Sequence, residues 1–189
     1  MGTGEVPTMS RRRILLGAAL ASPLLAVGVL WAAGASLPRT HVVALSARLK
    51  ASPTEVWHAV TDFEDAPSWR PDLASVTLGQ TEDGHPTYVE VDNRGRRVAY
   101  EVVEARFPDD LVVAITTANL GYGGSWSFSI HPDGDGTDLV ITERGFVRSA
   151  LGRAMDRYLG GRGASLRRYL GALGTKIGEP ITPREVSPP

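Results

Sequence analysis

Tight turn segments divide the middle of this 189-residue chain into strands that must run antiparallel. Four segments rich in Gly, Asp, Asn and Pro interrupt stretches in which apolar and polar residues alternate. They are Glu82–Gly84, Asn93–Gly95, Pro108–Asp110 and Pro132–Gly136. Such short connections join antiparallel neighbours, because a parallel crossover needs a dozen or more residues. The sequence therefore predicts six consecutive antiparallel strands: Ser75–Glu82, Pro86–Asp92, Arg97–Phe107, Asp110–Thr117, Ser125–His131 and Thr137–Val147.

The segments on either side of these strands predict one more strand and three helices. Residues 40–50 alternate as a half-buried strand does, and Ser52-Pro53 opens a short helix with a capping serine and a first-turn proline. A second helical turn is expected at 66–73, and residues 150–176 are expected to form one long helix. The predicted fold is α+β: a curved antiparallel sheet of about seven strands wraps around the long C-terminal helix, with one transmembrane helix before it.

A run of 25 uncharged residues, Ile14–Pro38, precedes the predicted domain. As a helix it exceeds the roughly 30 Å hydrocarbon layer, and the arginines at 11–13 favour a cytoplasmic amino terminus. We therefore expect a cytoplasmic segment at 1–13, a transmembrane helix at 14–37, an extracytoplasmic domain at 39–176 and a disordered, proline-rich tail at 177–189. In the alternative, Ala33-Gly34-Ala35 is a signal cleavage site and the exported domain is released.

Composition excludes several kinds of site. The chain has no cysteine, so disulfides and thiolate chemistry are excluded. Its net charge is −1 without a basic stripe, which argues against a nucleic-acid partner. His58 and Asp62 share a helix face but lack a third ligand, so neither a metal nor another cofactor is expected. There is no nucleophile elbow or phosphate loop.

The order of short motifs along the domain resembles the START-like (SRPBCC) superfamily of polyketide cyclases, dehydrases and lipid-transport proteins. The motifs are Leu49–Trp57, Val60–Phe63, Pro67–Pro71, Tyr100–Val102, Gly124–Phe128, Gly136–Glu143 and the closing helix. This resemblance implies the helix-grip fold, and many bacterial members carry a membrane helix just before the first strand. Members bind lipids, sterols, polyketides, hormones and quinones, and only some branches are enzymes.

In such a fold, the residues that face the closing helix are expected to line an apolar ligand cavity. The candidates are Trp69, Tyr100, Val102, Val113, Ile115, Trp126, Phe128, Ile141, Glu143, Met155, Tyr158 and Leu159. In the alternative, the apolar ones fill a solid core. Gly160, Gly161 and Gly163 favour a cavity beneath the helix, since each costs ~1 kcal/mol relative to alanine there. A helix break is the other explanation, and Gly121–Gly124 is expected to form a flexible loop beside the cavity.

Glu143 continues the inward set of its strand and is the one weak catalytic candidate. A carboxylate there would bind a ligand hydroxyl, or act as an acid or base if burial raised its pKa. In the alternative it pairs with Arg70 or Arg144 and is structural. The expected function is membrane-anchored binding of a hydrophobic, lipid-like or polyketide-like molecule. The alternative is a cyclase, dehydratase or hydrolase acting on such a ligand. The arginines of the last helix are expected to form a solvated face, or to contact anionic lipid headgroups.

Overall fold

The computed structural model of the chain describes residues 25–160 and 163–188. The expected cytoplasmic segment at 1–13 and the first part of the expected transmembrane helix, 14–24, lie outside these residues. Residues 25–35 are helical. Within the described ranges, no helix has the length and apolar character needed to cross a membrane.

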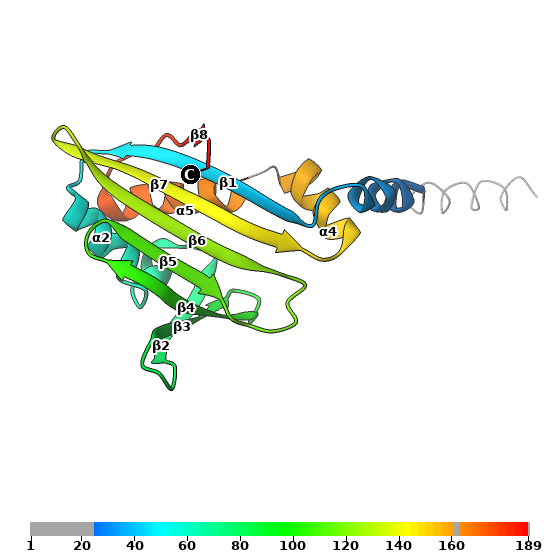
Figure 1. Cartoon of the computed structure of the whole chain (residues 1–189), viewed down its shortest axis with the longest axis horizontal. Helices are drawn as coiled ribbons and strands as arrows, with labels where there is room; N and C mark the ends of the chain where they lie inside the picture. The colour runs from blue at the N-terminus through cyan, green and yellow to red at the C-terminus, as the bar shows by residue number, and fades with distance from the viewer. Residues whose placement is uncertain (1–24, 161–162, 189) are drawn as a thin grey trace, which may run out of the picture.

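A single antiparallel sheet of eight strands forms the body of the domain (Figure 1). Its strands follow the order β2-β3-β4-β5-β6-β7-β1-β8. Their bounds are β1 Thr40–Leu49, β2 Leu73–Gln80, β3 Pro86–Asp92, β4 Arg97–Arg106, β5 Asp110–Ile115, β6 Tyr122–Asp133, β7 Gly136–Val147 and β8 Arg184–Val186. The α+β class and the antiparallel sheet are confirmed, and all seven expected strands are present, with ends shifted by a few residues. Sequence-neighbouring strands pair from β2 to β7, as the short turns require.

The eighth strand corrects the expectation of a disordered tail. Arg184–Val186 pairs with Ser46–Ala44 of β1, and Ile181 packs against the core. The Glu179 carboxylate also accepts hydrogen bonds from the backbone N–H of Lys50, at 2.9 and 3.1 Å. Without β8, one edge of β1 would expose unpaired backbone groups, so the tail is held by the pairing it supplies.

Two short helices follow β1 as expected. Helix α2 spans Pro53–Thr61, and α3 spans Ala66–Trp69. Ser52 and Glu55 cap α2 reciprocally: the Ser52 hydroxyl accepts from the Glu55 N–H, and the Glu55 carboxylate accepts from the Ser52 N–H. This capping box explains why the helix starts where the serine–proline pair predicts.

The expected single helix at 150–176 is wrong, because the structure divides it. Helix α4 spans Ala150–Met155, a π-helical segment η1 spans Asp156–Gly160, and α5 spans Ala164–Ile177. Gly163 precedes α5 with a φ of 72°, a conformation that side-chain-bearing residues rarely adopt. A Cβ at Gly163 would also lie 3.0 Å from Val43 Cγ1 of β1. Gly163 therefore allows the backbone turn before α5 and the close approach of this segment to the sheet.

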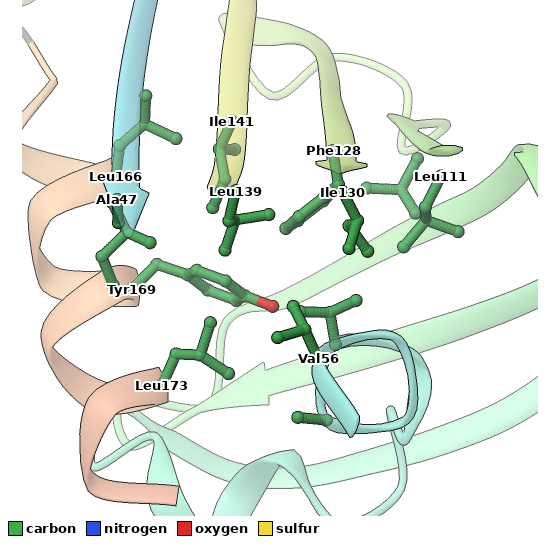
Figure 2. Close-up of a cluster of buried hydrophobic side chains, with 14 of the residues drawn as sticks. Ala47, Val56, Leu111, Phe128, Ile130, Leu139, Ile141, Leu166, Tyr169 and Leu173 are labelled. Atoms are coloured by element: carbon green, nitrogen blue, oxygen red, sulfur yellow. The ribbon is translucent and has the colours of Figure 1, made fainter. Parts of the chain in front are cut away.

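Helix α5 covers the concave face of the sheet and forms the core with it. Leu166, Leu170 and Leu173 of α5 are fully buried. In Figure 2, Tyr169 of α5 extends toward Phe128 of β6 and Leu139 of β7, and Leu166 and Leu173 belong to the same buried cluster. Beyond this packed part, the sheet curves away from the helix.

Candidate functional site

A cavity of about 940 Å³ lies between the sheet, the α2–α3 segment and α5. This volume is near the upper end of the range for small-molecule sites, about 300–1,000 Å³. Its lining comes from the end of α2, from α3, from strands β3 to β7 and from α5, with single residues from β1 (His41), β2 (Leu73) and η1 (Asp156). The sheet and α5 therefore meet closely at one part of their interface and diverge at another.

Seven of the expected cavity residues line it: Trp69, Tyr100, Val113, Ile115, Trp126, Phe128 and Glu143. Val102 and Ile141 do not; both are buried, with exposed fractions of 8% and 0%, and belong to the packed core. Apart from Trp69, which lies in α3, all of these were selected by the same strand alternation, which identifies the inward face. It does not show where along that face α5 packs.

The residues expected from the helix before Gly163 lie elsewhere. Met155 and Tyr158 are exposed, and of the described side chains of α4 and η1 only Asp156 lines the cavity. The Leu159 side chain lies outside the described part of the structure. The hollow expected beneath Gly160–Gly163 is also misplaced, since Gly163 rests against Val43 and Leu45. The helical wall of the cavity is instead α5, through residues such as Tyr169 and Ala172.

Aromatic rings form much of the wall. Phe63, Tyr88 and Tyr100 stack nearly parallel, with ring centroids 4.2 and 4.9 Å apart. Tyr169 of α5 meets Trp69 and Trp126 edge-on, at 5.5 and 5.4 Å. Burial raises the pKa of Tyr88, Tyr100 and Tyr169, so their hydroxyls stay neutral.

Tyr88 and Tyr169 were not selected from the sequence as cavity residues. Tyr88 is the cross-strand neighbour of Tyr100, and Tyr169 belongs to the apolar stripe of α5. Figure 2 shows Tyr169 reaching from α5 into the space between the sheet and Val56 of α2. The cross-strand register would have indicated Tyr88, because a residue opposite an inward tyrosine is itself inward.

An ion pair between Arg70 and Glu90 occupies the wall beside these rings. Both guanidinium Nη atoms donate to the carboxylate, Nη1 to Oε1 and Nη2 to Oε2. The two side chains are only 17% and 11% exposed. Burial alone would lower the pKa of Arg70, but the adjacent Glu90 carboxylate outweighs burial and raises it. The cavity therefore carries a fixed charged pair within a largely aromatic wall.

Glu143 anchors a second polar cluster in the lining. The Glu143 carboxylate lies 3.2 Å from His41 Nε2 through Oε1, and it accepts a hydrogen bond of 2.7 Å from the Ser165 hydroxyl through Oε2. Arg70, one of its two expected partners, binds Glu90 instead. Burial would raise the pKa of Glu143, but the hydrogen bonds from His41 and Ser165 outweigh it and lower the pKa. Glu143 is therefore an ionised acceptor and not the protonated acid that a raised pKa would produce.

This arrangement predicts how Glu143 affects stability at different pH values. A folded-state pKa below the ordinary value of 4.5 stabilises the fold above that pH, and the effect is lost as pH falls through the folded-state pKa. We expect the difference in unfolding free energy between wild type and Glu143→Gln to be largest at neutral pH and to shrink in acid. Urea unfolding over a pH series measures this. A difference that grew in acid would contradict it, and Glu82→Gln in an exposed turn is the matched control.

Among the described residues, no group of three or more His, Asp and Glu side chains has an arrangement that could hold a metal ion. What the cavity offers chemically is an aromatic and aliphatic surface with two polar clusters, Arg70–Glu90 and His41–Glu143–Ser165. Such a surface can enclose an apolar body and orient it through a few hydrogen bonds.

The fold recurs in solved structures of low sequence identity. A START superfamily protein from Mycobacterium smegmatis has a TM-score of 0.59 at 20% identity, over 73% of this chain and 97% of that one. Norcoclaurine synthase from Thalictrum flavum has a TM-score of 0.58 at 11% identity, over 73% and 93%. The di-domain ARO/CYC protein BexL of the BE-7585A biosynthetic pathway has a TM-score of 0.60 at 14% identity, over 86% and 58%. At these identities the likeness shows the fold alone.

No curated protein matches the chain. The sequence profile of the polyketide cyclase / dehydrase and lipid transport family matches residues 40–177. This match runs from the first residue of β1 to the last residue of α5, and so includes every element that lines the cavity. The chain belongs to the polyketide cyclase / dehydrase and lipid transport family.

Proposed function

We propose that this domain binds a hydrophobic small molecule, lipid-like or polyketide-like, in the cavity beneath α5. The observation that carries the proposal is the volume of about 940 Å³ left open beside a core whose leucines are fully buried. A domain that needed only stability would fill such a space, because unfilled apolar volume forfeits packing energy. The family's description, which includes lipid transport, supports the same function.

The two polar clusters restrict the ligand further. A purely aliphatic ligand would displace water from the charged groups of Arg70, Glu90 and Glu143 without offering them a hydrogen bond, at a cost in affinity. A ligand with an apolar, partly planar body and one or more hydroxyl or carbonyl groups would satisfy them. The driving force would be apolar burial at about 25 cal/mol per Å².

We place this activity at the membrane, outside the cytoplasm. Support comes from the uncharged run Ile14–Pro38 and the arginines before it. Retention by residues 14–37 is favoured over release by cleavage near Ala35. Protease protection of the full chain in sealed vesicles, with and without detergent, tests this placement.

Filling the cavity tests the binding function. Ala172 of α5 lines the cavity, so we expect Ala172→Phe to weaken binding of a fluorescent fatty acid by at least about tenfold, since the new ring occupies ligand volume. The matched control is Ala105→Phe, at an exposed position of β4 that does not line the cavity. Native mass spectrometry of the purified chain gives an independent readout. An empty wild-type protein that binds no hydrophobic probe would refute the proposal.

A second candidate is an enzyme of the cyclase or dehydratase type. The observation that favours it is an ionised carboxylate, Glu143, held inside the cavity where it could accept a proton from a ligand. The enzyme predicts turnover of a poly-β-keto substrate that is lost in Glu143→Gln while the probe still binds. If the wild type bound the substrate without turnover, the enzyme hypothesis would be rejected and the binding function would stand.

A further inference from the structure

The helix at residues 25–35, which we call the leading helix, packs against α4 through Gly34. Gly34 lies so close to α4 that a Cβ added there would be 1.8 Å from the Ala150 carbonyl oxygen. Arg153 of α4, which is 9% exposed, donates from Nε to the Gly34 carbonyl at 2.9 Å. Its Nη1 donates to the carbonyls of Arg148 and Val147, at 2.7 and 3.3 Å. In Figure 1 the helix at 25–35 accordingly projects from the end of the domain beside α4.

Exposed apolar side chains gather on the two segments that this contact joins. Six of the ten large hydrophobic side chains exposed in the described residues belong to 25–35, α4 or η1. They are Leu25, Val27, Val29, Trp31, Met155 and Tyr158. Single exposed hydrophobics are ordinary, but a cluster at one end of a molecule marks an interaction surface.

Three exposed arginines lie in or next to the segments that carry these apolar side chains. Arg39, Arg148 and Arg157 are exposed there, against one exposed acid, Asp156. Within the described part of the chain, none of the three arginines forms an ion pair with a carboxylate. The guanidinium of Arg157 instead lies 5.7 Å from the centre of the Tyr158 ring. Exposed aromatic and aliphatic groups flanked by arginines are the composition that binds the interface of an anionic bilayer.

We infer that this end of the domain docks on an anionic lipid bilayer through a surface that we call the α4 surface. It consists of Arg39, Arg148, Met155, Arg157 and Tyr158. A bilayer is the partner that the sequence places nearest, because the uncharged run ends at Pro38, one residue before Arg39. The inference extends the membrane placement proposed above, but it does not depend on what the cavity binds.

Docking in this orientation would bring one end of the cavity to the lipid. Tyr122, Val147 and Asp156 line the cavity, and Val147 is the last residue of β7 before α4. The cavity thus extends to the end of the sheet where the α4 surface lies. A hydrophobic ligand could then move between bilayer and cavity over a short path, which would avoid the cost of exposing it to water.

Single cysteine labels test the docking, since the chain has no cysteine of its own. Tyr158→Cys and Val103→Cys are a matched pair, because both side chains are 56% exposed and Val103 lies on β4, outside the α4 surface. Each full-length variant carries a fluorophore and is reconstituted in vesicles containing phosphatidylglycerol. We expect nitroxide-labelled lipids to quench the label at 158 at least about threefold more than the label at 103, and aqueous iodide to show the reverse order.

Charge and glycine variants separate docking from simple tethering. Arg157→Gln should lower the ratio of docked to undocked protein by about fivefold, whereas Arg94→Gln, in an exposed turn of the sheet, should not. Gly34→Ala forces the leading helix away from α4 and should abolish the difference between the two labels. Gly28→Ala is its control on the same helix, because a Cβ there meets nothing within 4 Å.

Two outcomes would overturn the inference. The first is equal lipid quenching at positions 158 and 103 in the vesicles. The second concerns the protein in detergent without lipid: the label at position 158 is protected from iodide, and this protection rises with protein concentration. That result would identify a second copy of the chain as the partner that covers the surface. Failure of the ligand-binding proposal is seen separately, because the fatty-acid probe reports the cavity and the labels report the surface.

Discussion

Replacing Arg70 with alanine is expected to lower the free energy of unfolding by about 3 kcal/mol, because the change leaves the Glu90 carboxylate in the cavity wall without its counter-charge. Glu90 is 11% exposed at its side chain, so water compensates for little of the lost ion pair. Arg70 also stands over the Tyr169 ring at 5.8 Å, and that contact is lost as well. Urea unfolding of the full-length variant measures the effect.

The control for this prediction is Arg106→Ala. Arg106 pairs with Glu104 and Asp110, but its side chain is 68% exposed. We therefore expect Arg106→Ala to lower the free energy of unfolding by less than about 1 kcal/mol. The double variant Arg70→Ala/Glu90→Gln should recover part of the loss, since a neutral amide tolerates burial better than an unpaired carboxylate. Equal effects of Arg70→Ala and Arg106→Ala would show that the cavity pair is screened like a surface pair.

Substituting alanine for Gly124 is expected to destabilise the domain by about 3 kcal/mol, because the backbone there is closed to a side chain. Gly124 has a φ of +138°, and a Cβ would lie 2.1 Å from the Arg144 carbonyl oxygen of the paired strand β7. The three nearest atoms, from Arg144 and Gly145, are all backbone, so relief requires the β6–β7 ladder itself to shift. Thermal or urea unfolding measures the loss.

Gly171→Ala provides the comparison for Gly124→Ala. Gly171 lies within α5, where a Cβ meets nothing within 4 Å, so alanine should stabilise the helix by about 0.5–1 kcal/mol. Similar stability changes at the two positions would refute the structural argument. The requirement at Gly124 also corrects the expectation of a flexible loop at 121–124, because β6 already begins at Tyr122 and pairs with β7.

Local sequence was sufficient for most of the sheet and for the family. Alternation and turn chemistry act over a few residues, so strands such as Pro86–Asp92 and the capped start of α2 at Ser52 could be predicted directly. Alternation also identified the inward face, which is why Trp126 and Phe128 were correctly expected in the cavity lining. What the pattern could not separate was Val113 in the lining from Val102 in the packed core, since both face inward.

The amino-acid sequence by itself determined the elements, their antiparallel order and the apolar inner surface of the sheet. Only the tertiary structure decided the break before α5, the Arg70–Glu90 pair and the pairing of β8 with β1. Each of these features depends on a contact between groups that are distant in sequence. Gly163 lies against Val43 of β1, Arg70 pairs with Glu90 on β3, and β8 pairs with β1. Close backbone contacts and buried charges result from the packing of one element against another, so a local sequence pattern does not predict them.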